Sequence, residues 1–147
     1  SSEVYIKEIG DPKKYDEIVF CGYGEPTIRW DVVKEVAKFV KANGGSTRIN
    51  TNGHGNLINK KDITPEMKDV IDVVSISFNT FDSKQYAELM RVSEDHFEEM
   101  KNFARLAKQY VTKVVMSVVS LDEVEIEKSR KVVEDEIGVE FRVREYF

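Results

Sequence analysis

The sequence has few cysteines and histidines and no long apolar run, and each scarcity excludes a class of protein. One cysteine in 147 residues cannot form an internal disulfide and fits a reducing compartment, so we expect a cytoplasmic protein. Two histidines without metal-site spacing argue against a zinc site. No stretch approaches the roughly 20 apolar residues of a membrane span, and there is no signal-peptide pattern. The net charge of −5 argues against a general nucleic-acid binder.

Short apolar runs and amphipathic segments alternate along the chain, which predicts strands and helices in turn. The predicted strands are 18–21, 47–51, 73–79, 114–119 and 139–146. Helices are predicted from near Trp30 to Gly44, from Ser83 through Arg91, over 97–110 and over 126–137, and a further one begins with an N-cap at Thr64. Residues 1–10 are either a short helix or a ragged terminus. Strict alternation indicates parallel strands with helical crossovers in one domain, 1–147. Five such steps are too few for a closed barrel of roughly 250 residues, which leaves an open doubly wound sheet or a partial barrel.

The loop Cys21-Gly-Tyr-Gly-Glu-Pro-Thr27, between the first strand and a helix, is the most informative segment. Gly22 and Gly24 permit a ligand to approach the backbone or the chain to take positive φ, and Pro26 restricts the turn. Glu25 supplies one acid at the strand end. A ligand loop and an ordinary turn with a solvent-facing glutamate are both compatible with this pattern.

Polar residues recur at or near the ends of the predicted strands. They are Glu25 on the first, Asn50, Thr51 and Asn52 on the second, Ser75, Ser77 and Asn79 on the third, Ser117 on the fourth, and Arg142 and Arg144 on the fifth. By strand periodicity Ser77 and Asn79 share one face, and so do the two arginines. Each of these polar residues, taken alone, is common in a strand. Because they converge on the same edge of the sheet, they predict a small-molecule pocket that includes Arg142.

Three of these segments together resemble motifs of the radical S-adenosylmethionine (radical SAM) superfamily. Phe20-Cys-Gly-Tyr-Gly-Glu-Pro-Thr27 resembles its GGEP element, Asn50-Thr-Asn-Gly53 its TNG strand end, and Ser75-Ile-Ser-Phe-Asn79 its ribose motif. The combination is most similar to the TatD-linked branch. The resemblance implies a parallel partial (β/α)6 TIM-like barrel that binds S-adenosylmethionine (SAM), with Gly22, Tyr23, Gly24, Glu25 and Pro26 against its methionyl amine. It also implies that Asn50, Asn52, Ser77 and Asn79 lie near its carboxylate or ribose.

The chain departs from the superfamily in its cysteines. The family's CxxxCxxC loop supplies three thiolates to a [4Fe–4S] cluster, whereas this chain has Cys21 alone, which cannot ligate such a cluster. We therefore expect a chain that lacks the first strand and its cluster loop, belongs to a SAM-cleaving enzyme of unknown substrate, and is inactive by itself. The alternative is a cluster-free SAM- or nucleotide-binding module; no GxGxxG or GxxxxGK[ST] motif supports a phosphate-binding domain.

Further expectations concern the sheet edge and single residues. Without a preceding strand, residues 18–21 would be an unprotected edge, so we expect self-association or marginal stability there. We also expect Cys21 to be a small buried residue, His96 to be solvated, His54 to lie close to a ligand, and Tyr86 and Met90 to be in the core.

Overall fold

A computed structural model describes residues 1–21, 24–120 and 125–145 and contains, within these ranges, five parallel strands. They are β1 (Ile18–Phe20), β2 (Thr47–Thr51), β3 (Val73–Ser77), β4 (Lys113–Val119) and β5 (Glu140–Arg144). The strands lie in sequential order, β1-β2-β3-β4-β5, and each neighbouring pair is parallel. The predicted α/β fold with a parallel, partial TIM-like barrel is confirmed.

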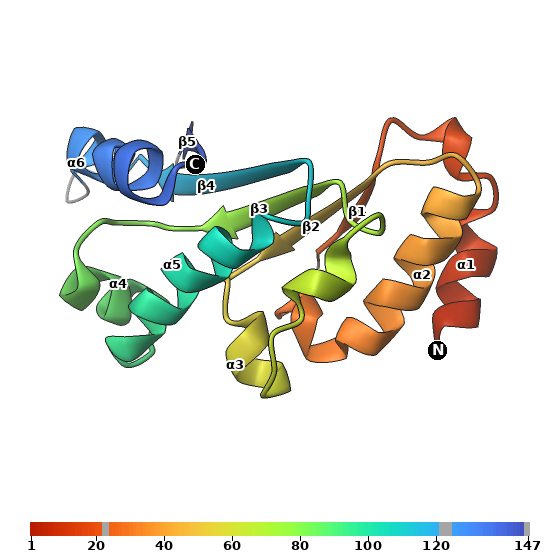
Figure 1. Ribbon diagram of the computed structural model, residues 1–147, viewed down its shortest axis with the longest axis horizontal. Coiled ribbons are helices and arrows are strands. Elements are labelled where there is room, and N and C mark those ends of the chain that lie inside the picture. Colours follow the sequence, from red (N-terminus) through yellow and green to blue (C-terminus); the bar gives the residue numbers. More distant parts are fainter. Residues whose placement is uncertain (22–23, 121–124, 146–147) are drawn as a thin grey trace.

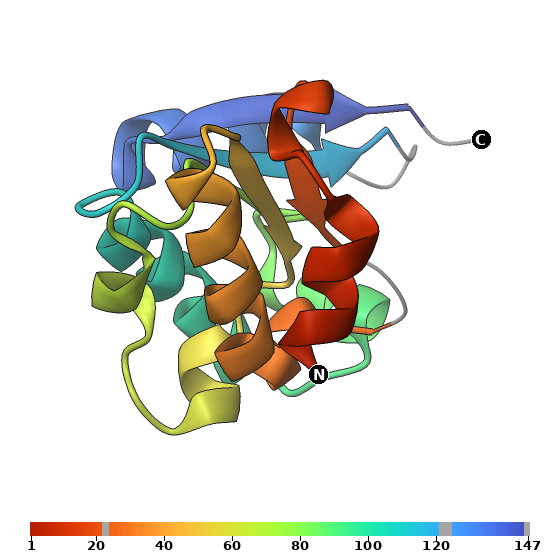
Figure 2. The same cartoon turned by 90° about the vertical axis from the view of Figure 1, so that its right-hand side faces the viewer.

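Helical segments connect the strands. The α-helices are α1 (Ser2–Ile9), α2 (Trp30–Ala42), α3 (Gly55–Asn59), α4 (Ser83–Met90), α5 (Asp95–Ala107) and α6 (Ile126–Lys131). Helix α6 continues as a π-helical turn, Val132–Ile137. Short 3₁₀ turns lie at Pro12–Lys14, Pro26–Arg29 and Thr64–Met67. Helices α2, α3 and α5 lie to one side of the sheet (Figures 1 and 2). None of the helices in the described part of the chain is long and apolar enough to cross a membrane.

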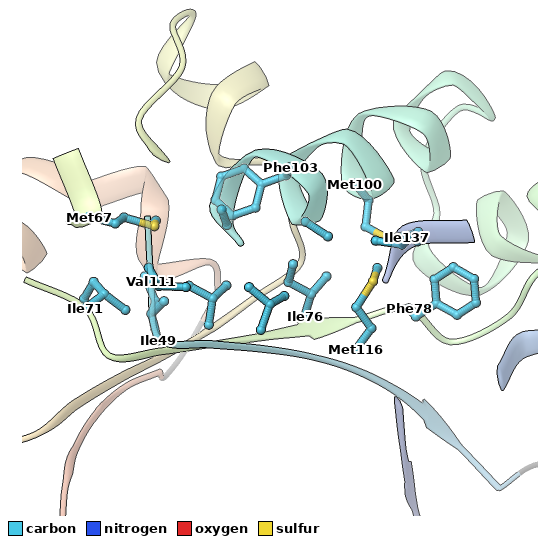
Figure 3. Packing of buried hydrophobic residues seen from close by; sticks show 14 of the residues in the cluster. Ile49, Met67, Ile71, Ile76, Phe78, Met100, Phe103, Val111, Met116 and Ile137 are labelled. Atoms are coloured by element: carbon cyan, nitrogen blue, oxygen red, sulfur yellow. The ribbon is translucent and has the colours of Figure 1, made fainter. Parts of the chain in front are cut away.

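The hydrophobic core fills the space between these helices and one face of the sheet (Figure 3). Alternate residues of β3, Val74 and Ile76, point into it, and so does Met116 of β4. Met100 and Phe103 of α5 meet them from the helical layer, and both are almost fully buried. Because strand side chains alternate in direction, the polar residues between these core residues face the opposite, open side of the sheet.

The third strand is shorter than the predicted 73–79. The backbone amides of Phe78 and Asn79 both donate to the carbonyl of Ser117, at 2.8 and 3.0 Å, and Asn79 has a φ of 66°. The chain therefore turns out of the ladder after Ser77. Asn79 therefore lies outside the strand, and the prediction that Ser77 and Asn79 share one face stays a prediction.

Two predicted helix starts are also corrected. Thr64 is not an N-cap; the carboxylate of Asp62 accepts its backbone N–H at 3.0 Å, and only a 3₁₀ turn follows. The cap of α4 is Asp82, rather than Ser83, and its carboxylate accepts the amides of Lys84 and Gln85. In both cases an aspartate one or two residues upstream supplies the acceptor, as favoured caps do.

Strand β1 forms one edge of the sheet described here, with β2 as its partner. The N-terminal segment does not pair with it, because residues 2–9 form α1, which packs against α2. Val19, at the centre of β1, is 39% exposed. Self-association through this edge stays a prediction.

Candidate functional site

The carboxylate of Glu25 joins the loop after β1 to the end of β2. Its Oε1 accepts the backbone N–H of Asn52 at 2.7 Å, and its Oε2 accepts the hydroxyl of Thr51 at 2.6 Å. The same Oε2 accepts the amide of Thr27 at 3.1 Å and also its hydroxyl. Four donors from two motifs thus converge on one half-buried side chain. Glu25 is therefore already bonded to protein and orients the loop, rather than presenting a free carboxylate.

The turn after β2 is packed tightly against the core. Gly53 has a φ of +81°, and a Cβ atom at this position would lie 2.9 Å from Cγ of Met100 and 3.2 Å from Cγ2 of Ile76. The side-chain oxygen of Asn52 accepts the amide of His54 at 2.9 Å. The turn therefore requires glycine, and the Asn52 side chain is partly occupied in holding it.

Asn79, at the end of β3, carries an unsatisfied buried polar atom. Its side-chain Oδ1 is the one buried side-chain nitrogen or oxygen without a hydrogen-bond partner in the described chain. Its Nδ2 lies 2.9 Å from Sδ of Met90, a weak acceptor. A buried carbonyl oxygen without a donor costs free energy, so this atom is suited to accept a hydrogen bond from a ligand.

The open face of the sheet carries a polar cavity of about 440 Å³, here called the open-face cavity. It is lined by Glu17, Val19, Arg48, Asn50, Ser75, Ile76, Ser77, Val115, Ser117, Arg142 and Arg144. The guanidinium of Arg48 donates to Glu17 at 3.0 Å and to the hydroxyl of Ser75 at 2.9 Å. The expected shared face of Arg142 and Arg144 is confirmed.

A second hollow of about 600 Å³, mostly apolar, follows the free edge of β1 between α1 and α2. Cys21, Gly24, Glu25 and Pro26 contribute to its lining. Cys21 is exposed, so its predicted burial is wrong.

Beneath the turn after β2 lies a cluster of three aromatic side chains. His54 is buried, and its Nε2 lies 2.8 Å from the hydroxyl of Tyr86, which is fully buried as predicted. The ring of His96 meets that of His54 edge to face at a centroid distance of 5.0 Å, so His96 is half-buried rather than solvated. Burial lowers the pKa of His54, with a further lowering by His96 and an opposing effect of Glu25. Burial likewise raises the pKa of Tyr86, whose hydroxyl stays protonated.

The lowered pKa of His54 predicts a loss of stability in mild acid. The unfolded chain takes up a proton near pH 6.5, whereas the folded chain does so only at lower pH. The free energy of unfolding should therefore fall as the pH drops from 7 to 5. His54→Gln, which does not titrate, should flatten this dependence in urea unfolding measured at both pH values.

His96→Gln is the matched control, since it removes the other histidine and leaves His54 in place. It should keep most of the pH dependence. Glu66 contributes little between pH 7 and 5, because hydrogen bonds chiefly from Lys34 lower its pKa from the ordinary 4.5 to about 2, and its effect on stability changes mainly below that ordinary value. A dependence that survives in His54→Gln at full size would contradict the assignment to His54.

The predicted site residues thus fall into two groups, and two lie outside the described residues. Glu25 and Asn52 meet directly, with Gly24 and Pro26 in the same loop as Glu25. Asn79, which follows β3, belongs to neither group and contacts Met90. Asn50, Ser77 and Arg142 line the open-face cavity. Gly22 and Tyr23 are the two that the structure does not describe. The contacts of Thr27 with Glu25 were missed, although the spacing Glu-Pro-Thr is that of a carboxylate that caps a following turn.

These residues differ in how they fit the two cofactors that the motifs imply. The described residues contain no group of three histidine, cysteine or acidic side chains that would hold a metal, and the whole chain has one cysteine. A [4Fe–4S] cluster therefore does not fit the residues of this chain. The open-face cavity offers amide, hydroxyl and guanidinium groups that are chemically compatible with the carboxylate and ribose of SAM. Asn79 lies outside this lining and offers one unpartnered acceptor, Oδ1.

A parallel α/β sheet with polar residues at its strand ends defines a class of enzymes and binding proteins that take ligands there. The family model for the radical SAM superfamily matches residues 3–134, and the chain belongs to this superfamily. Among curated proteins, the chain is 29% identical over 110 residues to the uncharacterized protein MJ0804 of Methanocaldococcus jannaschii. That alignment covers 74% of this chain and 37% of the relative. The chain thus spans little more than a third of the curated relative's length.

Two solved structures are similar in fold. A structure of TYW1 with a lysine-pyruvate adduct bound superposes with a TM-score of 0.70 and 15% identity, covering 99% of this chain and 48% of that one. A domain of pyruvate-formate lyase-activating enzyme from Bacteroides vulgatus ATCC 8482 superposes with a TM-score of 0.53 and 12% identity. This match covers 88% of this chain and 99% of that domain. At these identities the similarity concerns the fold alone.

Proposed function

We propose that this chain is the SAM-binding part of a radical SAM enzyme, of the TatD-linked type that its motifs resemble. The observation that carries the proposal is the Glu25 bridge, which holds the GYGEP loop against the Asn50–Gly53 turn. These are the two segments that the resemblance assigns to SAM. Membership of the superfamily supports the same assignment.

In this proposal Gly24 and Pro26 approach the methionyl part of SAM, and Glu25 positions their loop. Asn79 accepts a hydrogen bond at Oδ1, which has no partner among the described residues. Asn50 and Ser77 approach from the open-face cavity. In the superfamily SAM supplies a 5′-deoxyadenosyl radical that removes a hydrogen atom from the substrate, and the protein contributes orientation and shielding. The chain alone lacks the thiolates for this chemistry and is proposed to be inactive.

Binding of S-adenosylhomocysteine, measured by calorimetry, tests the proposal without any redox chemistry. Asn79→Ala should weaken binding about tenfold or more, because a buried hydrogen bond to the ligand is lost. The same change also removes the contact of Nδ2 with Met90 and places alanine at a positive φ, so thermal stability should fall by about 1–2 kcal/mol, and circular dichroism checks that the variant is folded. Equal affinity in the two proteins, or no binding by the parent chain, would contradict the proposal.

Asn102→Ala is the matched control, because Asn102 is exposed on α5, where its side-chain oxygen accepts from Arg105 at 3.1 Å. It should bind like the parent chain. A cluster-free SAM-binding module would give the same calorimetric result. The gene sequence upstream of residue 1 distinguishes the two, since an in-frame CxxxCxxC motif belongs to the enzyme.

A further inference from the structure

A row of polar side chains crosses the last three strands on the open face. In the strand register Ser77 of β3 lies beside Ser117 of β4, and Ser117 lies beside Arg142 of β5. Arg144 follows two residues later on the same face, next to Val119. Neighbouring strands lie about 4.8 Å apart, so two hydroxyls and two guanidinium groups are within reach of one small ligand.

The hydrogen-bonding capacity of this row is largely unused. Within the part of the chain that the structure describes, the hydroxyls of Ser77 and Ser117 have no hydrogen-bond partner, and Arg144 has no ion pair. Arg142 donates to Glu140 on its own strand, at 3.2 Å, and its side chain is 45% exposed. Such an exposed pair contributes little and can be exchanged for a ligand.

The charged side chains that line the cavity give it a net positive charge. Its described lining contains three arginines and one acid, Glu17, which is paired with Arg48. Arg142 and Arg144 therefore make their end of the cavity positive, on a chain whose net charge is −5. A positive recess on an acidic protein attracts small anions, and two guanidinium forks match the oxygens of a carboxylate or phosphate.

We propose that Arg142, Arg144, Ser77 and Ser117 bind an anionic group, a carboxylate or a phosphate, of the enzyme's substrate. This inference rests on the proposed function, because the substrate must lie beside SAM at the same strand ends. Ser77, which the motifs connect with SAM, and Arg142, which belongs to the predicted pocket, then border both ligands. Arg144 and Ser117 belong to the substrate side alone.

Titration of the ¹⁵N-labelled chain with inorganic phosphate, and separately with succinate, tests the site by NMR at constant ionic strength. Arg144→Gln should weaken binding of the preferred anion about tenfold, because a charge-assisted bidentate contact is lost. Ser117→Ala should weaken it less, through one hydroxyl. Arg105→Gln removes the same charge from α5, on the helical side of the sheet, and should bind like the parent chain.

Calorimetry with S-adenosylhomocysteine on the same variants separates this inference from the proposed function. The site is supported if Arg144→Gln loses anion affinity and keeps its S-adenosylhomocysteine affinity, whichever anion binds better. If Arg144→Gln weakens S-adenosylhomocysteine equally and that ligand displaces the anion, the arginines bind the SAM carboxylate and the substrate inference is wrong. Equal anion affinity in Arg144→Gln and Arg105→Gln would also overturn it, since binding would then depend only on general charge.

Discussion

Replacing Gly53 by alanine should lower the free energy of unfolding by about 2–5 kcal/mol, the sum of a positive-φ cost and an overpacking cost. The added methyl group would meet Met100 at 2.9 Å and Ile76 at 3.2 Å, and both side chains are fully or almost fully buried. Neither can move aside without disturbing α5 or β3. Urea unfolding monitored by circular dichroism measures the change.

Gly10→Ala separates the two contributions. Gly10 also has a positive φ, of 66°, but a Cβ atom there would have no heavy atom within 4 Å. This variant should lose only a conformational part, of at least about 1–2 kcal/mol, because its φ of 66° and ψ of −116° lie outside the left-handed helical region. Equal losses in the two variants would mean that Gly53 is required for its backbone conformation and not for its close packing.

Glu25→Ala should destabilise the chain by about 2–4 kcal/mol, because four donors lose a charged acceptor in a half-buried position. The same substitution should abolish S-adenosylhomocysteine binding, since the loop after β1 is no longer held to the end of β2. Thermal unfolding measures the loss of stability, and calorimetry measures the affinity for S-adenosylhomocysteine. The effect is indirect, through the backbone at Asn52 and Thr27.

The control is Glu134→Ala, at an exposed position on the π-helical turn after α6. It removes the same charge and should change stability by less than about 0.5 kcal/mol. If Glu25→Ala lost binding at unchanged stability, the carboxylate would contact the ligand directly. The positioning role would then be wrong.

Hydrophobic periodicity predicted the sheet well, because strand and helix periods are set by local geometry. The parallel strands and the long helices α2 and α5 follow from this pattern. Helix α3 was missed because it has five residues and no apolar stripe. The end of β3 at Ser77, with a positive φ at Asn79, was missed because both amides after the strand bond the Ser117 carbonyl, which is 38 residues from Asn79 in sequence.

The sequence predicted where several residues of the candidate site lie, but it did not predict the hydrogen bonds between them. Motif resemblance located Glu25, Asn52 and Asn79 correctly near strand ends. It did not reveal that Glu25 is saturated by protein donors, because Thr51 and Asn52 approach it from another strand. The burial of His54 against Tyr86 likewise depends on where α4 packs.

Because side chains alternate across the sheet, the residues of the core and the residues of the open face are different sets. Residues such as Ile76 and Met116 carry the core, while their neighbours Ser75, Ser77 and Ser117 occupy the opposite face. Substitution of the second group leaves the packed layer in Figure 3 untouched. Single substitutions on the open face should therefore change its chemistry with little loss of folding stability.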